Sequence, residues 1–210
     1  MFSELNLEEF LITLGKYNID IWPLQIFSYI LGIAALVLAI KRTGFSDRAI
    51  SLILSFFWLW SGIVFCIIYW SDSFKLAYIF GILLIIQGLI FLYSAIRRNI
   101  SFSYTGNSYS IIGILLIFYA IIGYFLIGLF IGHTYPRFFA FGLVPCPTAI
   151  FTLGLLLWTD KKISKHIIII PALLSLAGIV AIIKGIYEDI GLLVLGLLAA
   201  FLILYKDKRA

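Results

Sequence analysis

Four residues of this sequence could do chemistry together: Asp20, Cys66, His133 and Cys146. Thiolate sulfur and imidazole nitrogen suit soft or borderline metal ions such as zinc or copper. The four residues are far apart in the chain, however, and a lone cysteine inside a membrane is most often a small packing residue. The sequence therefore offers them as a candidate solute or metal site, in which the identity of any metal is unknown.

The stretch around Cys146 is unusual because Pro145 and Pro147 flank it within an apolar run, with Gly142 just upstream. Proline lacks a backbone donor and clashes with the preceding turn, so we expect a broken helix. The new helix would begin near Cys146 or Pro147, with Cys146 as its N-cap and Pro147 in the favoured first position. A thiol at a helix N-terminus tends towards thiolate character. Breaks of this kind form the binding sites of many transporters.

Three roles of this stretch remain open. The first is packing around a broken helix, and the second is a soft-ligand or transport site. The third is redox chemistry, because an oxidising outer compartment would permit a disulfide between Cys66 and Cys146.

Composition determines the elements that must position these residues. Hydrophobic residues make up 63% of the 210 residues and charged residues only 12%, and the mean hydropathy is +1.14. A soluble domain is about half apolar and one quarter charged. The net charge of +5 comes from small basic clusters between apolar runs, a membrane-topology signal rather than a groove for nucleic acid.

The fold class that follows is all-α: a polytopic bundle of about seven spans in a single integral membrane domain, 1–210. About 20 apolar residues are needed to cross a hydrocarbon core of about 30 Å. The predicted spans, the fifth of them broken by proline, are 20–40, 49–70, 74–96, 109–132, 138–158, 167–184 and 189–205.

The distribution of charge predicts an N-out, C-in orientation. With the N-terminus outside, only Lys16, Lys75, Arg137 and Lys184 fall on the outer side, and the other basic residues face the cytoplasm. The acidic start, MFSELNLEEF, lacks the basic region of a signal peptide, so we expect the first span to drive insertion. All four candidate residues then lie towards the outer side.

A short helix at 7–15 precedes the first span, with Asn6 as its N-cap and Gly15 as its stop. It is one-sided and too short to cross the membrane, so we expect it to lie at the interface. Asp20 is expected to cap the first span, with Pro23 in its first turn.

Polar and small residues within the spans have simpler roles. We expect Gln25 and Gln87 to form intramembrane hydrogen bonds between helices. Small residues at four-residue spacing, Ser28–Gly32 and Gly128–Gly132, allow close packing within the monomer, with a homo-oligomeric face as the alternative.

Three blocks of the sequence resemble signature blocks of an uncharacterised family of bacterial integral membrane proteins, classed as a domain of unknown function. They are YNIDIWPLQ (17–25), WLWSGIVF (58–65) and GHTYPRFFAFGLVPCPTAIFTLGLLL (132–157). The blocks occur in the family's order and the likeness covers most of the chain. The resemblance implies a multi-pass protein of the bacterial cytoplasmic membrane with no established activity.

The sequence departs from the resemblance at one place. Where the family pattern implies Tyr-His, this chain has Phe65-Cys66, and the Asn-Pro pair implied shortly afterwards is absent near 71–74. Cys66 would replace that histidine by a softer ligand.

The favoured function is binding or transport of a small solute or soft metal ion through a site at the broken fifth span. The alternative is a structural or accessory membrane protein with no solute site, and the third is a thiol-redox membrane protein. The sequence shows no nucleophile–base pairing, phosphate loop or metalloprotease helix, so no enzyme is expected. Membrane lipid is the expected partner, and no cofactor beyond the soft metal ion is expected.

Overall fold

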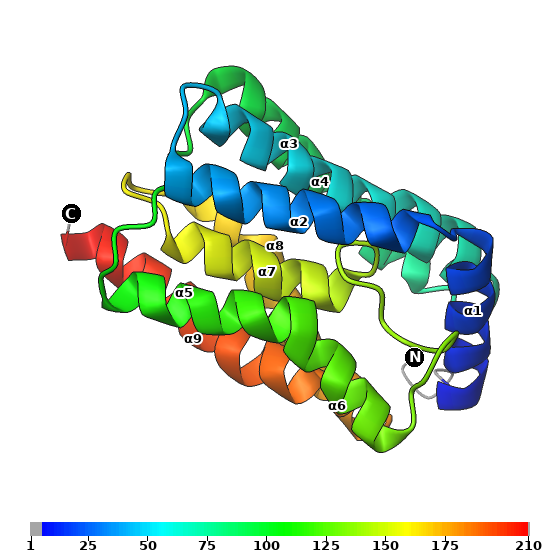
Figure 1. Cartoon of the computed structure of the whole chain (residues 1–210). Coiled ribbons are helices and arrows are strands. Elements are labelled where there is room, and N and C mark those ends of the chain that lie inside the picture. The colour runs from blue at the N-terminus through cyan, green and yellow to red at the C-terminus, as the bar shows by residue number, and fades with distance from the viewer. Residues whose placement is uncertain (1–5, 210) are drawn as a thin grey trace.

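The structure is a computed structural model that describes residues 6–209, and its regular elements there are helices. Figure 1 shows them as an elongated bundle with one helix lying crosswise at one end. In chain order they are α1 (Leu7–Asp20), α2 (Leu24–Lys41), α3 (Ser46–Trp60), η1 (Ser61–Tyr69), η2 (Trp70–Asp72), α4 (Ala77–Arg97), α5 (Ser108–Phe118), η3 (Tyr119–Gly123), α6 (Tyr124–Ile131), α7 (Pro145–Leu157), α8 (Lys165–Ile183) and α9 (Asp189–Arg209).

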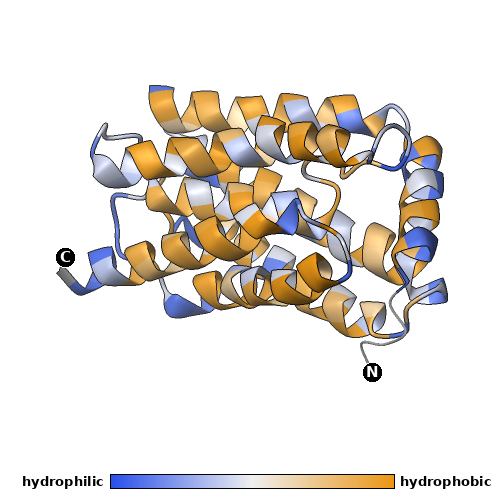
Figure 2. Ribbon diagram, turned by 90° about the horizontal axis from the view of Figure 1, so that it is seen from below, coloured by the Kyte–Doolittle hydropathy of each residue, from blue (hydrophilic) through white to orange (hydrophobic). Residues whose placement is uncertain are grey.

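Six helical stretches of the described chain are long and apolar enough to cross a membrane, which makes this a multi-pass membrane protein. They are Leu24–Lys41, Ser46–Asp72, Ala77–Arg97, Ser108–Ile131, Lys165–Ile183 and Asp189–Lys208. In Figure 2 these helices are largely hydrophobic, and polar residues gather mainly at the two ends of the bundle. Two of the stretches contain wide π-helical turns, η1 and η3, which the sequence analysis did not predict.

The predicted fifth span, 138–158, is broken as expected: α7 begins at Pro145 and has 13 residues. At 1.5 Å per residue it is about 20 Å long, too short to cross a core of about 30 Å. Val144 is its N-cap, with extended backbone, and Pro145 takes the first helical position. The prediction of Cys146 as the N-cap and Pro147 in the first position was therefore wrong by two residues. The residue before a proline favours extended backbone, which fits Val144 as the boundary.

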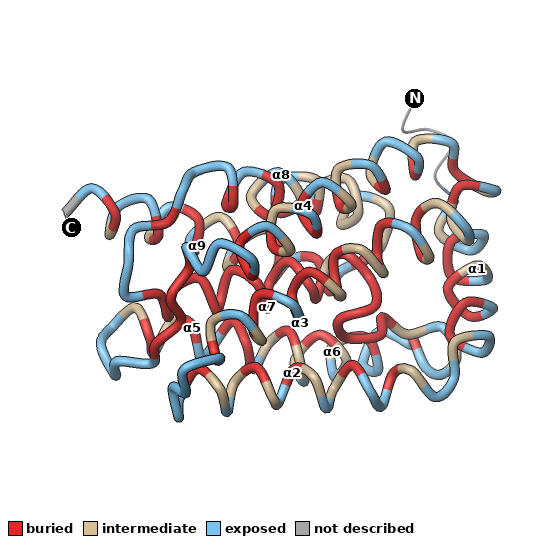
Figure 3. The backbone as a smooth tube through the Cα atoms, turned by 90° about the horizontal axis from the view of Figure 1, so that it is seen from above, coloured by how far each residue is buried: buried red, intermediate tan, exposed pale blue. Residues whose placement is uncertain are grey.

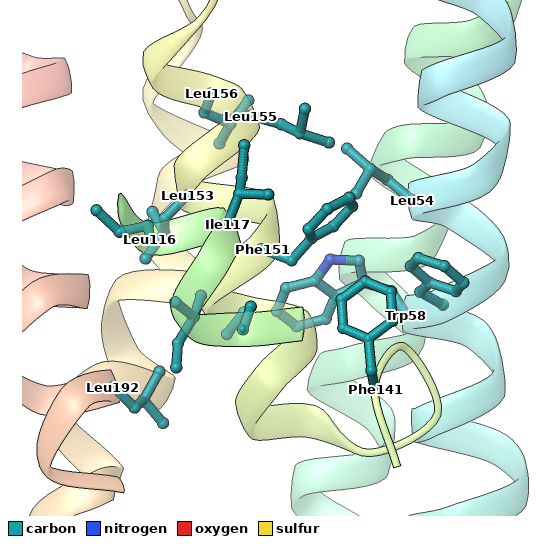
Figure 4. Packing of buried hydrophobic residues seen from close by; sticks show 14 of the residues in the cluster. Leu54, Trp58, Leu116, Ile117, Phe141, Phe151, Leu153, Leu155, Leu156 and Leu192 are labelled. Atoms are coloured by element: carbon teal, nitrogen blue, oxygen red, sulfur yellow. The ribbon is translucent and has the colours of Figure 1, made fainter. Parts of the chain in front are cut away.

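Helix α7 forms the centre of the bundle. Every one of its residues is buried except Cys146, which is half-buried, and Figure 3 shows it as a buried tube among the surrounding helices. It packs on α3, α5, α8 and α9. Figure 4 shows Phe151 of α7 beside Trp58 of α3 and Phe141 of the preceding segment, and all three side chains are buried.

Helix α1 is longer than the predicted helix at 7–15, because it continues to Asp20. The predicted cap is confirmed, since Asn6 Oδ1 accepts a hydrogen bond from the backbone N–H of Glu8 at 3.0 Å. Gly15 does not stop the helix; a Cβ atom there would lie 3.3 Å from Cγ of Arg137, so glycine permits close packing instead. Asp20 ends α1 and does not cap the first span, which begins at Leu24.

One member of each predicted small-residue pair, Gly32 and Gly128, packs closely within the chain, whereas Gly132 is exposed with open space around it. A Cβ atom on Gly32 would lie 2.5 Å from a ring carbon of Phe141, so α2 approaches the segment before α7 closely. Gly128 lies beside His133 and Glu188. These contacts are the close packing that small residues allow.

The end of the bundle opposite α1 is fastened by a polar cluster around Arg42. Its guanidinium donates hydrogen bonds to Ser101, Ser103 and Asp160, and Nη2 lies 2.5 Å from the Asp160 carboxylate. Partial burial acts to raise the pKa of Asp160, but hydrogen bonds from Ser101 and Arg42 and the charge of Arg42 outweigh it and lower that pKa. The loop after α4 is thereby tied to the loop after α7, where Phe102 and Thr159 form an isolated bridge.

Candidate functional site at the start of helix α7

A cavity of about 150 Å³ lies beside the first turn of α7. Among the described residues lining it, Cys146 and Asp189 carry the ionisable side chains. The rest of its wall is apolar apart from an indole N–H: Phe10, Phe65, Trp70, Phe74, Phe80, Phe139, Val144, Pro145, Leu174, Ala177, Gly178, Val180, Ala181 and Ile186. A concave, mostly apolar pocket with a few polar groups is the usual form of a small-molecule site.

Asp189 is the first residue of α9, and its carboxylate receives two side-chain donors. Cys146 donates from Sγ to Oδ2 at 3.4 Å, and the hydroxyl of Tyr124 donates to Oδ1. An acidic side chain in the first turn also suits the helix dipole. The expectation of a thiolate at Cys146 is wrong, because the thiol donates its proton to a neighbouring carboxylate and a second negative charge there would be repelled.

Glu188, the preceding residue, pairs with His133. The Nδ1 atom of His133 lies 2.6 Å from Oε1 of Glu188, and both side chains are buried. Gly132 has left-handed backbone with φ of 94°, which turns the chain at the end of α6 so that His133 faces back into the bundle. The backbone carbonyl of Glu188 also accepts a hydrogen bond from Tyr119 at 2.7 Å.

Of the four residues that the sequence analysis selected, two contact adjacent acids: Cys146 contacts Asp189, and His133 contacts Glu188. Cys66 is buried in η1 and does not line the cavity, although its neighbour Phe65 does. Asp20 lies exposed at the end of α1, where it accepts a hydrogen bond from Tyr69 at 3.0 Å.

The described residues contain no group of three His, Cys, Asp or Glu side chains arranged to hold a metal ion. Both cysteines are free thiols, so no disulfide joins Cys66 and Cys146.

The irregular segment 132–144 is held in place by α1. The side-chain amide of Asn18 donates to the carbonyls of Pro136 and Phe138, at 2.6 Å each. The hydroxyl of Tyr17 donates to the carbonyl of Leu143 at 2.7 Å and accepts from Trp60 Nε1 at 2.9 Å. Irregular backbone inside a membrane protein requires such partners, because lipid supplies none.

The predicted intramembrane glutamines each form a hydrogen bond to a backbone carbonyl of another helix. Gln87 donates to the carbonyl of Ile167 at 3.0 Å and links α4 to α8. Gln25 donates to the carbonyl of Asn18 at 2.7 Å, so it braces α1 against the start of α2. Neither residue lines the cavity.

Sequence reasoning missed Asp189, Glu188, Tyr124 and Tyr17 as members of the site. Nothing in the sequence analysis assigned Glu188 and Asp189 to a site. The signal available was their position: two consecutive acids directly before an apolar run place one carboxylate in the first turn of a buried helix.

Comparison with curated proteins and comparison with solved structures found no match. A family model, described as a family of unknown function (DUF6064), matches residues 7–210. The match begins at the first residue of α1 and includes every element that builds the cavity. This multi-pass membrane protein therefore belongs to the DUF6064 family of unknown function.

Proposed function

We propose that this protein binds or transports a small organic solute in the cavity at the start of α7. The observation that supports this function is the cavity itself, of about 150 Å³, whose lining is aromatic and aliphatic and includes the residues Asp189 and Cys146. The cavity adjoins the break before α7, and backbone breaks within membrane proteins commonly form substrate sites.

An organic solute fits better than a soft metal ion. Cys146 and Asp189 could supply two ligands, and the remaining wall of the cavity is almost entirely hydrocarbon. Zinc and copper sites use three or four nitrogen, sulfur or oxygen ligands. The wall instead offers apolar area for a hydrocarbon body.

The proposal includes an orientation in the bacterial cytoplasmic membrane, N-out and C-in. It is supported by the positive-inside distribution of lysine and arginine. The crosswise position of α1 in Figure 1 also suits a helix at the outer interface. In this orientation the cavity lies in the outer half of the membrane, accessible to a solute from outside the cell.

The test uses Cys146 as a reporter of the cavity. In a Cys66→Ala background Cys146 is the only thiol, and its reaction with the small neutral reagent methyl methanethiosulfonate is followed in detergent-solubilised protein. We expect reaction to be slowed by Ala177→Phe, which fills the cavity, and by small apolar-bodied solutes such as 1-butanol.

Ile179→Phe is the matched control, because Ile179 is 44% exposed on the same helix, about 200° around the helix axis from Ala177, and does not line the cavity. It should leave the rate unchanged. A Cys146 that reacts at the same rate in all variants, with no protection by any solute tried, would contradict the proposed function and favour a structural role for the break.

A further inference from the structure

The cavity beside α7 presents hydrocarbon to the molecule that fills it. Asp189 is only 1% exposed, and both of its carboxylate oxygens accept hydrogen bonds, from Tyr124 and Cys146. The indole nitrogen of Trp70 is buried as well. An apolar cavity of about 150 Å³ stays dry and takes up a hydrocarbon molecule the size of benzene. The part of the ligand inside the cavity should therefore be hydrocarbon.

The cavity lies between the start of α4 and the last turns of α8. Phe74 and Phe80 line it from the first side, and Ala177, Val180 and Ala181 line it from the second. Helices α4 and α8 are in contact, and Figure 3 shows them side by side. The small side chains on α8 leave room opposite the two phenylalanine rings.

The seam between these two helices faces the bilayer. Both helices are long and apolar enough to cross a membrane. Large apolar side chains beside the cavity are exposed on each of them: Ile79 and Ile82 on α4, and Leu176 and Ile179 on α8. The hydrocarbon nearest to the cavity is thus an acyl chain of the surrounding lipid.

Two lysines lie where such a lipid would place its headgroup. Lys75 directly follows Phe74, and Lys184 ends α8 one helical turn, about 5.4 Å, after Val180. Lysine side chains near the ends of membrane helices extend to the headgroup level. The cavity, one turn further in, is then level with the first carbons of the acyl chains.

Neither lysine has a counter-ion within the part of the chain that the structure describes, whose ion pairs involve other residues. Cations are scarce on this side of the membrane, where the proposed orientation places Lys16, Lys75, Arg137 and Lys184. Arg137 is paired with Glu8, and Lys16 is exposed on α1 and does not line the cavity. The phosphate of a lipid is the anion available to Lys75 and Lys184.

We propose that the cavity takes one acyl chain of an anionic phospholipid, whose phosphate lies beside Lys75 and Lys184 in the leaflet next to α1. The inference rests on the proposed function, since it names the chemical class of the solute that the cavity takes. The chain fills the apolar cavity, and the charged headgroup stays outside it at the membrane surface.

The experiment compares two phospholipids with the same chains, anionic dioleoylphosphatidylglycerol and zwitterionic dioleoylphosphatidylcholine. Each is titrated into dodecylmaltoside micelles that contain the Cys66→Ala protein at low ionic strength, and the reaction of Cys146 with methyl methanethiosulfonate is followed. We expect the anionic lipid to halve the rate at a mole fraction at least about tenfold lower, since each lysine near the surface contributes about fivefold. Glycerol phosphate, which carries the charge without a chain, should leave the rate unchanged.

Lys75→Gln and Lys184→Gln should each reduce the preference for the anionic lipid about fivefold, and the double variant should abolish it. Lys16→Gln is the matched control and should leave the preference unchanged. Equal protection by the two phospholipids would overturn the inference. A preference that survives in the double variant would also overturn it, because it would reflect the charge of the micelle rather than the two lysines. The two lipids are first compared with all lysines intact, so misfolding of a variant cannot hide the result.

The outcomes also separate this inference from the proposed function. Protection by 1-butanol without protection by either phospholipid overturns the lipid inference and leaves solute binding in place. Failure of 1-butanol and of both phospholipids, together with a rate unchanged by Ala177→Phe, overturns both.

Discussion

The Nδ1 atom of His133 lies 2.6 Å from Oε1 of Glu188, inside the protein, although 55 residues separate the two in the chain. This pair joins the segment that follows α6 to the residue that precedes α9. It lies next to Asp189 and the cavity, so it fixes the geometry of the candidate site as well as the fold.

Removing one partner of this pair should be strongly destabilising. Glu188→Gln leaves His133 facing a neutral group in a buried site, and breaking a buried pair from one side typically costs about 3–5 kcal/mol. His133→Gln should cost a similar amount, and the double variant less than the sum of the two. Thermal unfolding in detergent measures all three.

Glu8→Gln is the control for this cycle, because Glu8 forms a salt bridge with Arg137 at the surface, where a pair contributes about 0–1 kcal/mol. If Glu188→Gln is no more destabilising than Glu8→Gln, the buried pair does not hold these segments together.

Tyr17→Phe should loosen the segment before α7. It removes the donor to the carbonyl of Leu143 and the acceptor for Trp60 Nε1, and each buried group left without a partner costs about 1–3 kcal/mol. Burial raises the pKa of Tyr17, so its hydroxyl keeps the proton that it donates through neutral and alkaline pH. Tyr78→Phe, at a half-exposed tyrosine on α4, should leave the unfolding temperature unchanged.

Gly142→Ala should be among the most disruptive small substitutions in the chain. Gly142 has φ of +73°, and an added Cβ would lie 2.9 Å from a ring carbon of Phe57. Left-handed backbone alone costs a non-glycine residue about 1–2 kcal/mol, and the buried ring cannot move freely away.

Two other glycines separate these effects. Gly106 has φ of +71° with open space around it, and Gly44 has open space and no positive φ. Unfolding temperatures should therefore fall in the order Gly44→Ala, Gly106→Ala, Gly142→Ala. A Gly142→Ala protein no less stable than Gly106→Ala would show that Phe57 accommodates the methyl group.

The contribution of Asp160 to stability should depend on pH. Its pKa is lowered in the folded protein, so the stabilisation is present above the unfolded pKa of about 3.9 and is lost as pH falls through the folded value. The difference in unfolding temperature between the parent protein and Asp160→Asn should accordingly be larger at pH 7 than at pH 3.

Because the Arg42–Asp160 pair is only partly buried, with exposed side-chain fractions of 49% and 28%, high salt should also reduce this difference. Asp72→Asn, at an exposed aspartate at the other end of the bundle, serves as the control. A difference for Asp160→Asn that is the same at both pH values would contradict the role of its ion pair with Arg42.

Composition and local chemistry were enough to predict the membrane bundle, the helix break and the cap at Asn6. Each depends on residues close together in the sequence: an apolar run, Pro145 and Pro147, or an asparagine before a helical pattern. The exact start of α7 was missed because Pro145 and Pro147 can each occupy the first helical position, and in the structure Pro145 occupies it.

The partners within the site could not be predicted in the same way. Asp189 meets Cys146 across 43 residues, and nothing in the sequence near either one indicates the other. The three blocks quoted for the family resemblance also meet in space, since Tyr17, Trp60 and Leu143 form one chain of hydrogen bonds. Such long-range contacts depend on how the helices pack.

The enclosure of α7 has a consequence for how the protein is made. A helix about 20 Å long with no lipid-facing side cannot rest stably in the bilayer on its own, because its ends and its preceding loop need partners there. Two of the helices that enclose it, α8 and α9, are synthesised after it. The chain therefore completes its centre late, and biogenesis must shelter residues 132–157 until the C-terminal helices have been inserted.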